Sequence, residues 1–418
     1  MAIAVAVFLL ALAVIATERV HRTKVALIGA ALVVLLVGEY SQEKAIEAVD
    51  FNTIGLLVGM MILVVLTQQT GVYDYIAIRA GQLSKGRTLA VVISLATTTA
   101  VLSAFLDNLT TILLVVPITF LLADALDIDP IPLVVIEVMA SNIGGTATLI
   151  GDPPNIIIAG ATGLTFNQFL ANLAPIAALT FVVVTSLLYL YYRRRLQIDP
   201  ENPHYVMELD ARRSIDDPAE LRRTGPILVA TVLLFFAHQP LHIEPATVAL
   251  SGAALALLVT RIDLEEVLAK IEWPTLFFFV GLFVMVGALE VTGAIDEVAT
   301  AVENLTGGDR TAELFAITWI SAAGAAAVDN IPFATAMIPV VEQLNTNNDD
   351  AYWWALALGT CFGGNATIIA AAANVAAAGL TERAGRPIGF LEFMKVGVPV
   401  TVVSVSLASL YIGARYVA

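Results

Sequence analysis

Two dipeptides place a carboxylate beside an amide within long apolar stretches of this chain. Asp107-Asn108 stands in the first half, and Asp329-Asn330 repeats the pair in the second. An ionised carboxylate at the centre of an apolar helix costs about 3 kcal/mol or more, so such a residue is a candidate for binding a cation or a proton. Each aspartate is also suited to cap the helix that follows it, and the two roles are compatible. We predict an ion or proton role for both.

A segment rich in glycine and asparagine follows each of these pairs. Residues 141–148 are followed by Gly-Asp-Pro-Pro-Asn at 151–155, and residues 361–367 are followed by Asn374. The glycines and prolines prevent a regular helix, and the freed carbonyls with Asn, Thr and Asp side chains form an oxygen-rich shell suited to a hard cation. The second copy lacks the Asp and both prolines, so the copies are chemically unequal. Close helix packing explains the glycines but not the asparagines.

These segments supply the candidate residues for binding an ion or a substrate: Asp107, Asn108, Thr110, Asn142, Gly144, Gly145, Thr146, Thr148, Asp152, Asn155, Asp329, Asn330, Gly363, Gly364, Asn365, Thr367 and Asn374. The proton-coupling candidates are Asp107, Asp329, Asp152 and Glu137. Glu137 is a carboxylate among valines without a counterpart in the second half, and its alternative is a position facing the membrane interface. We predict sodium ligands among Asp107, Asn142, Asp329 and Asn365. We expect no catalytic residue, and no cofactor besides the coupling ion, H⁺ or Na⁺ or both.

The elements that position these residues are apolar. The chain has 418 residues, of which 58% are hydrophobic and 14% charged, whereas a soluble domain carries about 25% charged residues. Most stretches between charged clusters have about 17–25 residues, the length that crosses a bilayer as a helix. This excludes a soluble enzyme, a nucleic-acid binder, a secreted disulfide scaffold and a disordered chain. The single cysteine, Cys361, excludes an internal disulfide. We predict an all-α polytopic membrane protein in contact with lipid.

The chain contains two copies of one unit. Residues 25–32 return at 248–255, Asp107-Asn108 returns as Asp329-Asn330, and Gly144-Gly145 returns as Gly363-Gly364. Ordered matches with so little drift indicate duplication rather than apolar bias. The predicted units are a first repeat over 1–192 with a hairpin at 88–125 and a broken helix at 131–160, a linker over 193–223, and a second repeat over 224–418 with a hairpin at about 311–345 and a broken helix at 351–380.

The topology follows from counting apolar runs. Each half contains five spans and a hairpin that adds two crossings or none, so the number of crossings is odd and the second copy is inverted. Nearly all of the 21 Lys and Arg residues then fall on the side of the linker, with only Lys44, Arg310 and Arg415 on the other side. The positive-inside rule makes the linker cytoplasmic and both termini extracellular in the plasma membrane. We expect no Lys or Arg deep in a span.

These motifs are similar to those of a known group of transporters. Residues 106–111 and 142–155 resemble the first-half signature, 328–333 resembles a second-half signature, and 361–367 resembles the pink-eyed-dilution branch. The chain thus resembles the ion transporter superfamily with the citrate-transporter-like fold, and especially arsenite permeases, NhaD-type sodium/proton antiporters and pink-eyed-dilution proteins. The resemblance implies a scaffold domain, a mobile domain that holds the hairpins, elevator-like alternating access and a homodimer. Dicarboxylate carriers of the superfamily have Ser-Asn-Thr at both hairpin tips, where this chain has Asp-Asn.

We therefore predict a proton-coupled secondary transporter, not an enzyme, that exchanges sodium for protons and binds no nucleic acid. Two alternatives stay open: efflux of arsenite or antimonite, and transport of an anion such as chloride, a carboxylate or sulfate. Acidic hairpin tips disfavour a free anion, because like charges repel. An intramembrane aspartyl protease with Asp107 and Asp329 as its dyad is also disfavoured, because it does not explain the duplicated asparagine-rich breaks.

Overall fold

The computed structural model describes residues 1–17, 19–84, 87–197 and 210–417, and these residues form helices without any strand. Residues 198–209 of the predicted linker lie outside the described residues. Six described helices are long and apolar enough to cross a membrane: α4 (Phe51–Gln68), α6 (Thr88–Phe105), α7 (Asn108–Leu126), α10 (Phe166–Tyr192), α15 (Trp273–Val291) and α21 (Phe390–Ile412) with its extension to Val417. The all-α prediction is confirmed.

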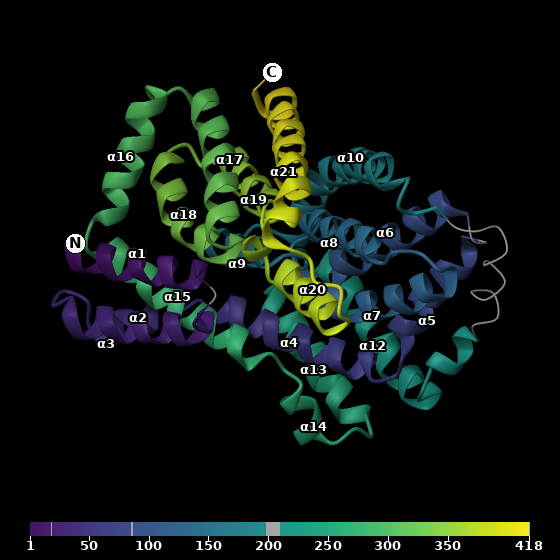
Figure 1. The fold of residues 1–418 in the computed structure, drawn as a ribbon. Helices are drawn as coiled ribbons and strands as arrows, with labels where there is room; N and C mark the ends of the chain where they lie inside the picture. The colour runs from purple at the N-terminus through teal and green to yellow at the C-terminus, as the bar shows by residue number, and fades with distance from the viewer. Residues whose placement is uncertain (18, 85–86, 198–209, 418) are drawn as a thin grey trace.

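The same order of helices occurs twice along the chain (Figure 1). The first half adds α1 (Ala2–Ala16), α2 (Arg22–Leu36), α3 (Gln42–Glu47), α5 (Val72–Leu83), α8 (Ile131–Thr146) and α9 (Pro153–Thr162). The second half adds α12 (Pro218–Ala237), α13 (Pro245–Val259), α14 (Leu264–Ala269), α16 (Ala294–Thr306), α17 (Arg310–Ala327), α18 (Asn330–Leu344), α19 (Ala351–Gly363) and α20 (Ala372–Arg383). The apolar runs did not predict α5 and α16, because a helix with one polar face interrupts such a run.

The two halves are intertwined through reciprocal contacts. Helix α2 packs on α15, and α13, the counterpart of α2, packs on α4, the counterpart of α15. A Cβ atom at Gly281 would lie 2.7 Å from the Ala26 backbone, and one at Gly59 would lie 2.6 Å from the Ala249 backbone. Both glycines therefore allow a close helix crossing, and the same crossing is made twice with the halves exchanged. The inverted orientation of the two copies in the membrane stays a prediction.

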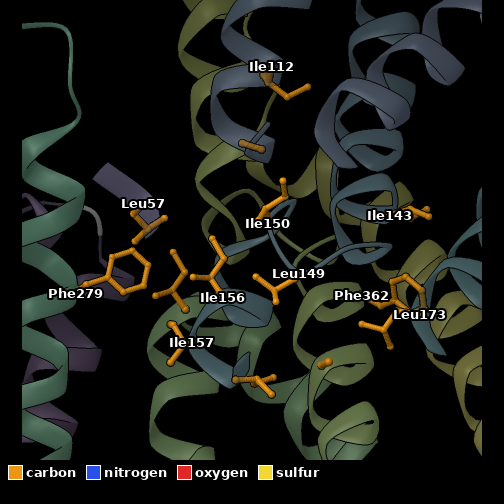
Figure 2. Packing of buried hydrophobic residues seen from close by; sticks show 14 of the residues in the cluster. Leu57, Ile112, Ile143, Leu149, Ile150, Ile156, Ile157, Leu173, Phe279 and Phe362 are labelled. Atoms are coloured by element: carbon orange, nitrogen blue, oxygen red, sulfur yellow. The ribbon is translucent and has the colours of Figure 1, made fainter. Parts of the chain in front are cut away.

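A second group of reciprocal contacts surrounds the helix breaks. Helix α20 packs on α7 and α18 packs on α9, while α8 and α19 contact each other directly. Leu149 and Ile150, which follow α8, are buried, and so are Leu57 of α4 and Ile156 of α9 (Figure 2). These apolar side chains exclude water from the backbone where the helices break. Polar groups at the breaks must therefore find partners within the protein.

Candidate functional site

Each hairpin turns at an aspartate that caps the returning helix. Asp107 Oδ1 accepts a hydrogen bond from the Thr110 backbone N–H at 2.7 Å, and its Oδ2 accepts one from Thr110 Oγ1 at 2.5 Å. Asp329 Oδ1 accepts from the Ile331 N–H at 2.9 Å. The capping role considered for both aspartates is therefore present, and it satisfies N–H groups that have no partner within the helix. In the described residues the two carboxylates share no hydrogen bond.

The two broken helices are held open in the same way. Asn155, at the start of α9, donates from Nδ2 to the carbonyls of Thr146 at 3.1 Å and Thr148 at 2.8 Å. Asn374, its counterpart at the start of α20, donates to the carbonyls of Gly364 and Thr367, both at 2.7 Å. These carbonyls have lost their helical partners at the break. Both asparagines thus stabilise the unwound backbone, and these contacts do not need a bound ion.

A threonine at each break binds the neighbouring hairpin. Thr148 Oγ1 donates to the carbonyl of Ala104, and Thr367 Oγ1 donates to the carbonyl of Ala326 at 2.9 Å. Each acceptor lies one helical turn before its hairpin tip, so the contact is the same in both halves. Each break and its hairpin therefore form one connected unit.

The glycines at the breaks lie against the hairpin limbs. A Cβ atom at Gly144 would lie 2.2 Å from the carbonyl oxygen of Ala100, and one at Gly363 would lie 2.6 Å from that of Ala322. Gly145 lies equally close to the backbone of Gly151. These distances are too short for any side chain, which makes close packing the role that the structure gives these glycines.

Asp152 joins the tips of both hairpins. Its Oδ1 accepts hydrogen bonds from Asn108 Nδ2 at 3.1 Å and from Asn330 Nδ2 at 3.2 Å. The side chain is fully buried. Its Oδ2 accepts no N–H or O–H hydrogen bond among the described residues, and the Cys361 thiol is the group that interacts with this carboxylate besides the two amides. The corresponding position in the second break is Ala371, so one carboxylate serves both hairpins. Burying a carboxylate oxygen without a donor costs free energy, and a bound proton or cation removes much of that cost.

A chain of amides extends from Asp152 across the interface between the halves. Asn142 accepts from Asn108 at 3.3 Å and donates to Asn365 at 3.1 Å and Asn374 at 2.9 Å. We call Asn108, Asn142, Asp152, Asn330, Asn365 and Asn374 the central polar cluster. Asn365 Nδ2 has no partner among the described residues.

The four predicted sodium ligands fall in two places. Asn142 and Asn365 contact each other in the central polar cluster, whereas Asp107 and Asp329 lie at the hairpin tips. In the described part of the chain, no hydrogen bond joins either tip aspartate to Asn142 or Asn365. The carboxylate that the cluster does contain is Asp152.

An arginine that the charge pattern assigns to a loop reaches this site. Arg22, the first residue of α2, places Nη1 3.1 Å from Asp329 Oδ2, and the Asp329 side chain is buried. The Arg22 guanidinium also lies over the Phe278 ring, 5.1 Å from its centroid. Arg22 begins α2 and does not lie in the middle of a span. The expectation that no Arg lies deep in a span nevertheless did not anticipate its contact with a buried aspartate. No local signal reveals it, because the two residues are 307 positions apart.

One further acidic group, Glu272, lies near the hairpin tips. Glu272 stands directly before α15, as Asp50 stands before α4, and it interacts electrostatically with both Asp107 and Arg22. Asp152 in turn faces the charges of Asp107 and Asp329. The site thus combines four carboxylates with one guanidinium. Glu272 is not among the residues predicted for the site, although its position before an apolar helix is visible in the sequence.

Glu137 is buried on α8 apart from this cluster. It is 1% exposed, and its Oε1 accepts a hydrogen bond from Thr119 Oγ1 of α7 at 2.6 Å. Its Oε2 has no partner in the described residues. The alternative of a residue facing the membrane interface does not fit this burial.

Two cavities lie near the hairpins and the breaks, and of these two the first is lined by residues of the site. One, of about 390 Å³, is lined by His21, Arg22, Leu109, Asp329 and Ala372 among others. Another, of about 240 Å³, lies between α9, α15 and α18 and is lined by Asp50, Glu290 and Glu342 among others. In residues 1–17, 19–84, 87–197 and 210–417, no group of His, Cys, Asp and Glu side chains has the arrangement of a metal site. The site offers oxygen ligands from amides, backbone carbonyls and single carboxylates.

Comparison with known proteins decides the family. The family model described as citrate transporter matches residues 12–359. The chain belongs to the citrate transporter family. An uncharacterized transporter of Mycobacterium tuberculosis is 43% identical over 99% of this chain and 98% of its own length. The human P protein is 34% identical over 96% of this chain, which spans 58% of the P protein.

A solved transporter structure has the same fold as this citrate transporter family member. The YdaH transporter of Alcanivorax borkumensis aligns with a TM-score of 0.57 over 87% of this chain and 85% of the YdaH chain, at 15% identity. The resemblance inferred from the motifs is confirmed, as is a helical multi-pass membrane protein. The family and its relatives indicate a transporter, which agrees with the expectation that the chain is not an enzyme.

Proposed function

We propose that this citrate transporter family member is a proton-coupled secondary transporter that exchanges sodium ions for protons. The observation that carries the proposal is Asp152, a fully buried carboxylate that binds the tip amides of both hairpins and has no amide or hydroxyl donor at its second oxygen. Whatever neutralises this carboxylate also determines how the two hairpins are held together. A binding event at Asp152 is thereby linked to the elements that would move.

The charge of the site favours a cation over a free anion. Asp107, Asp152, Glu272 and Asp329 together exceed the one positive charge of Arg22. Buried charges in excess are costly, so protons or cations must compensate them. Carboxylate and amide oxygens suit a hard cation such as Na⁺.

Exchange follows from competition for the same oxygens. A proton and a sodium ion each neutralise a carboxylate, and the two cannot occupy the same oxygen at once. If only the neutralised forms change conformation, inward movement of one ion requires outward movement of the other. Asp152 is the principal carboxylate of this proposal, Asp329 and Asp107 assist at the tips, and Glu137 is a separate proton carrier.

The proposal extends to the setting of the protein. We place it in the plasma membrane as a homodimer with a cytoplasmic linker and extracellular termini, working by an elevator-like movement of the hairpins against the scaffold helices. On that topology the cavity beside His21 and Arg22 opens toward the cytoplasm, and the cavity beside Glu290 and Glu342 opens outside.

The test is a substrate panel in proteoliposomes with an imposed pH gradient. Sodium, lithium, arsenite, citrate, sulfate and chloride are added one at a time while the internal pH is recorded. We expect sodium to dissipate the proton gradient with saturable kinetics. Citrate, sulfate and chloride are expected to leave the gradient unchanged. A gradient that responds to an anion and not to sodium would contradict the proposal.

Arg22 favours one alternative, the transport of a carboxylate anion. Its guanidinium lines the cavity of about 390 Å³ beside the hairpin tips, and guanidinium groups bind carboxylates with two parallel hydrogen bonds. The matching family is described as citrate transporter. Labelled citrate uptake that is lost in Arg22→Gln would support this alternative, whereas absence of uptake in the unaltered protein would exclude it.

A further inference from the structure

The two hairpin tips share the Asp-Asn pair but differ shortly after it. Thr110 follows the first pair, and Pro332 occupies the corresponding position after the second. Thr110 offers a backbone N–H and a hydroxyl, and it engages both oxygens of Asp107. Pro332 has no N–H and no hydroxyl. Asp329 therefore accepts one capping bond, from Ile331, and its second oxygen is left for another partner.

Arg22 is the partner of that second oxygen in this structure. It belongs to α2, which packs on α15, whereas Asp329 belongs to the hairpin formed by α17 and α18. The Arg22 side chain is 23% exposed and stacks on Phe278, so it remains at the edge of the cavity rather than within the cluster. The ion pair thus connects α2 to a hairpin tip. The position equivalent to Arg22 in the second half is Pro245, which provides no such pair for Asp107.

We propose that Arg22 is a tethered counter-ion that competes with the transported cation for Asp329 and, while it is bound there, holds the unloaded transporter in the arrangement seen here. The identity of the cation rests on the proposed function, but the holding role does not. When a proton or a metal cation neutralises Asp329, the guanidinium loses its partner and the hairpin is released. An empty carrier keeps the ion pair and does not reorient, which prevents one ion from leaking without exchange.

The surroundings explain why Arg22 remains available. Glu272 interacts electrostatically with both Arg22 and Asp107, Asp152 faces Asp329, and His21 precedes Arg22 at the start of α2. Released from Asp329, the guanidinium still has Glu272 nearby to compensate its charge. The exchange of partners therefore needs no transfer of the guanidinium into an apolar region.

The first experiment measures conformation without any transported ion. Val375→Cys places one thiol on the wall of the cavity that Arg22 lines, while the native Cys361 is fully buried and the unaltered protein measures its background. The rate of labelling by a maleimide is measured in nanodiscs. We expect Arg22→Gln to lower this rate about tenfold, because the unloaded protein no longer favours the arrangement seen here. Arg22→Lys, which keeps the charge, is expected to retain most of the rate.

The matched control is Arg19→Gln, which removes a charge from the same loop without a contact to Asp329. It is expected to leave the labelling rate unchanged. Unchanged labelling in Arg22→Gln, or an equal decrease in Arg19→Gln, would overturn the proposal. Size-exclusion chromatography of each variant in the nanodisc verifies that the comparison is made between folded proteins.

The second experiment measures competition. The sodium concentration for half-maximal exchange is expected to fall about tenfold in Arg22→Gln, and this difference is expected to vanish when Asp329→Asn is present in both proteins. A decrease that persists without Asp329 would contradict competition at this carboxylate. If labelling responds as expected but sodium drives no exchange in any variant, Arg22 holds the transporter and the sodium proposal fails.

Discussion

The two hairpin tips of this transporter share the Asp-Asn dipeptide but lie in different electrostatic surroundings. Asp107 is held by Thr110 of its own helix, whereas Asp329 is paired with Arg22 from a distant helix. The broken helices also differ in charge, because Asp152 of the first break contacts both hairpins and its counterpart in the second break is Ala371. The two halves share the order of their helices and the contacts at their breaks, whereas a few residue differences make their charges unequal.

The contacts that are the same in both halves are those between side chains and the backbone at the helix breaks. Asn155 and Asn374 bind the freed carbonyls of their own breaks, and Thr148 and Thr367 bind their own hairpins. These contacts depend on backbone geometry, which both halves share. The comparison therefore separates a symmetric framework from an asymmetric set of charges, and substitutions can test that separation.

The largest effect is expected at Asp152. Asp152→Asn removes the charge that a cation or a proton neutralises, while its remaining oxygen still accepts from Asn108 and Asn330. We expect sodium-driven proton exchange to fall by about 100-fold or more, which corresponds to a rise of about 2.7 kcal/mol or more in the activation free energy of transport. The measurement is initial flux in proteoliposomes. Asp124→Asn, at an exposed position of α7, is the control, and equal activity of the two variants would contradict the role of Asp152.

The next effect contrasts the two tips. Asp329→Ala is expected to reduce exchange about tenfold and to remove its dependence on Arg22, because the carboxylate that meets the cation is gone. Asp107→Ala is expected to reduce exchange less than Asp329→Ala does and to lower the unfolding free energy by about 1 kcal/mol through loss of the helix cap. Flux and thermal unfolding are measured for both. Equal loss of flux at the two tips would show that the tips share one role.

Exchanging the residues after the pairs tests the cause of the difference. Pro332→Thr is expected to provide Asp329 with a cap like that of Asp107 and so to weaken its pair with Arg22. The half-saturating sodium concentration should then fall several-fold, in the direction of Arg22→Gln. Thr110→Val, which removes only the hydroxyl bond to Asp107, is the matched change in the first hairpin and is expected to leave this concentration nearly unchanged. A shift of the same size in both variants would argue against the distinction.

The smallest effects are expected where the halves agree. Thr148→Val and Thr367→Val each remove one hydroxyl bond to a hairpin carbonyl. Each is expected to lower the unfolding free energy by about 1 kcal/mol, the usual contribution of one hydrogen bond. Thermal unfolding in detergent checks this, with Thr17→Val at an exposed site as the control. Clearly unequal effects would show that the framework is less symmetric than its contacts indicate.

Much of the framework could be predicted from the sequence because its causes are local. Glycine and proline break the helices at 144–154, the asparagines accompany the breaks, and the repeat is visible in the order of motifs. Apolar length indicates the membrane. The candidate residues of the central polar cluster were also found this way, since amides and carboxylates are rare inside apolar runs.

The partners of those residues were decided by the tertiary structure. Asp152 meets Asn330 across 178 positions, and Arg22 meets Asp329 across 307. Such pairs depend on how α2 packs on α15 and how the hairpins meet the breaks, which is the sum of many apolar contacts rather than a local preference. The order of residues alone was therefore enough to predict a membrane transporter with repeated motifs and polar breaks. Only packing decided that one carboxylate would join both hairpins and that one arginine would hold a single tip.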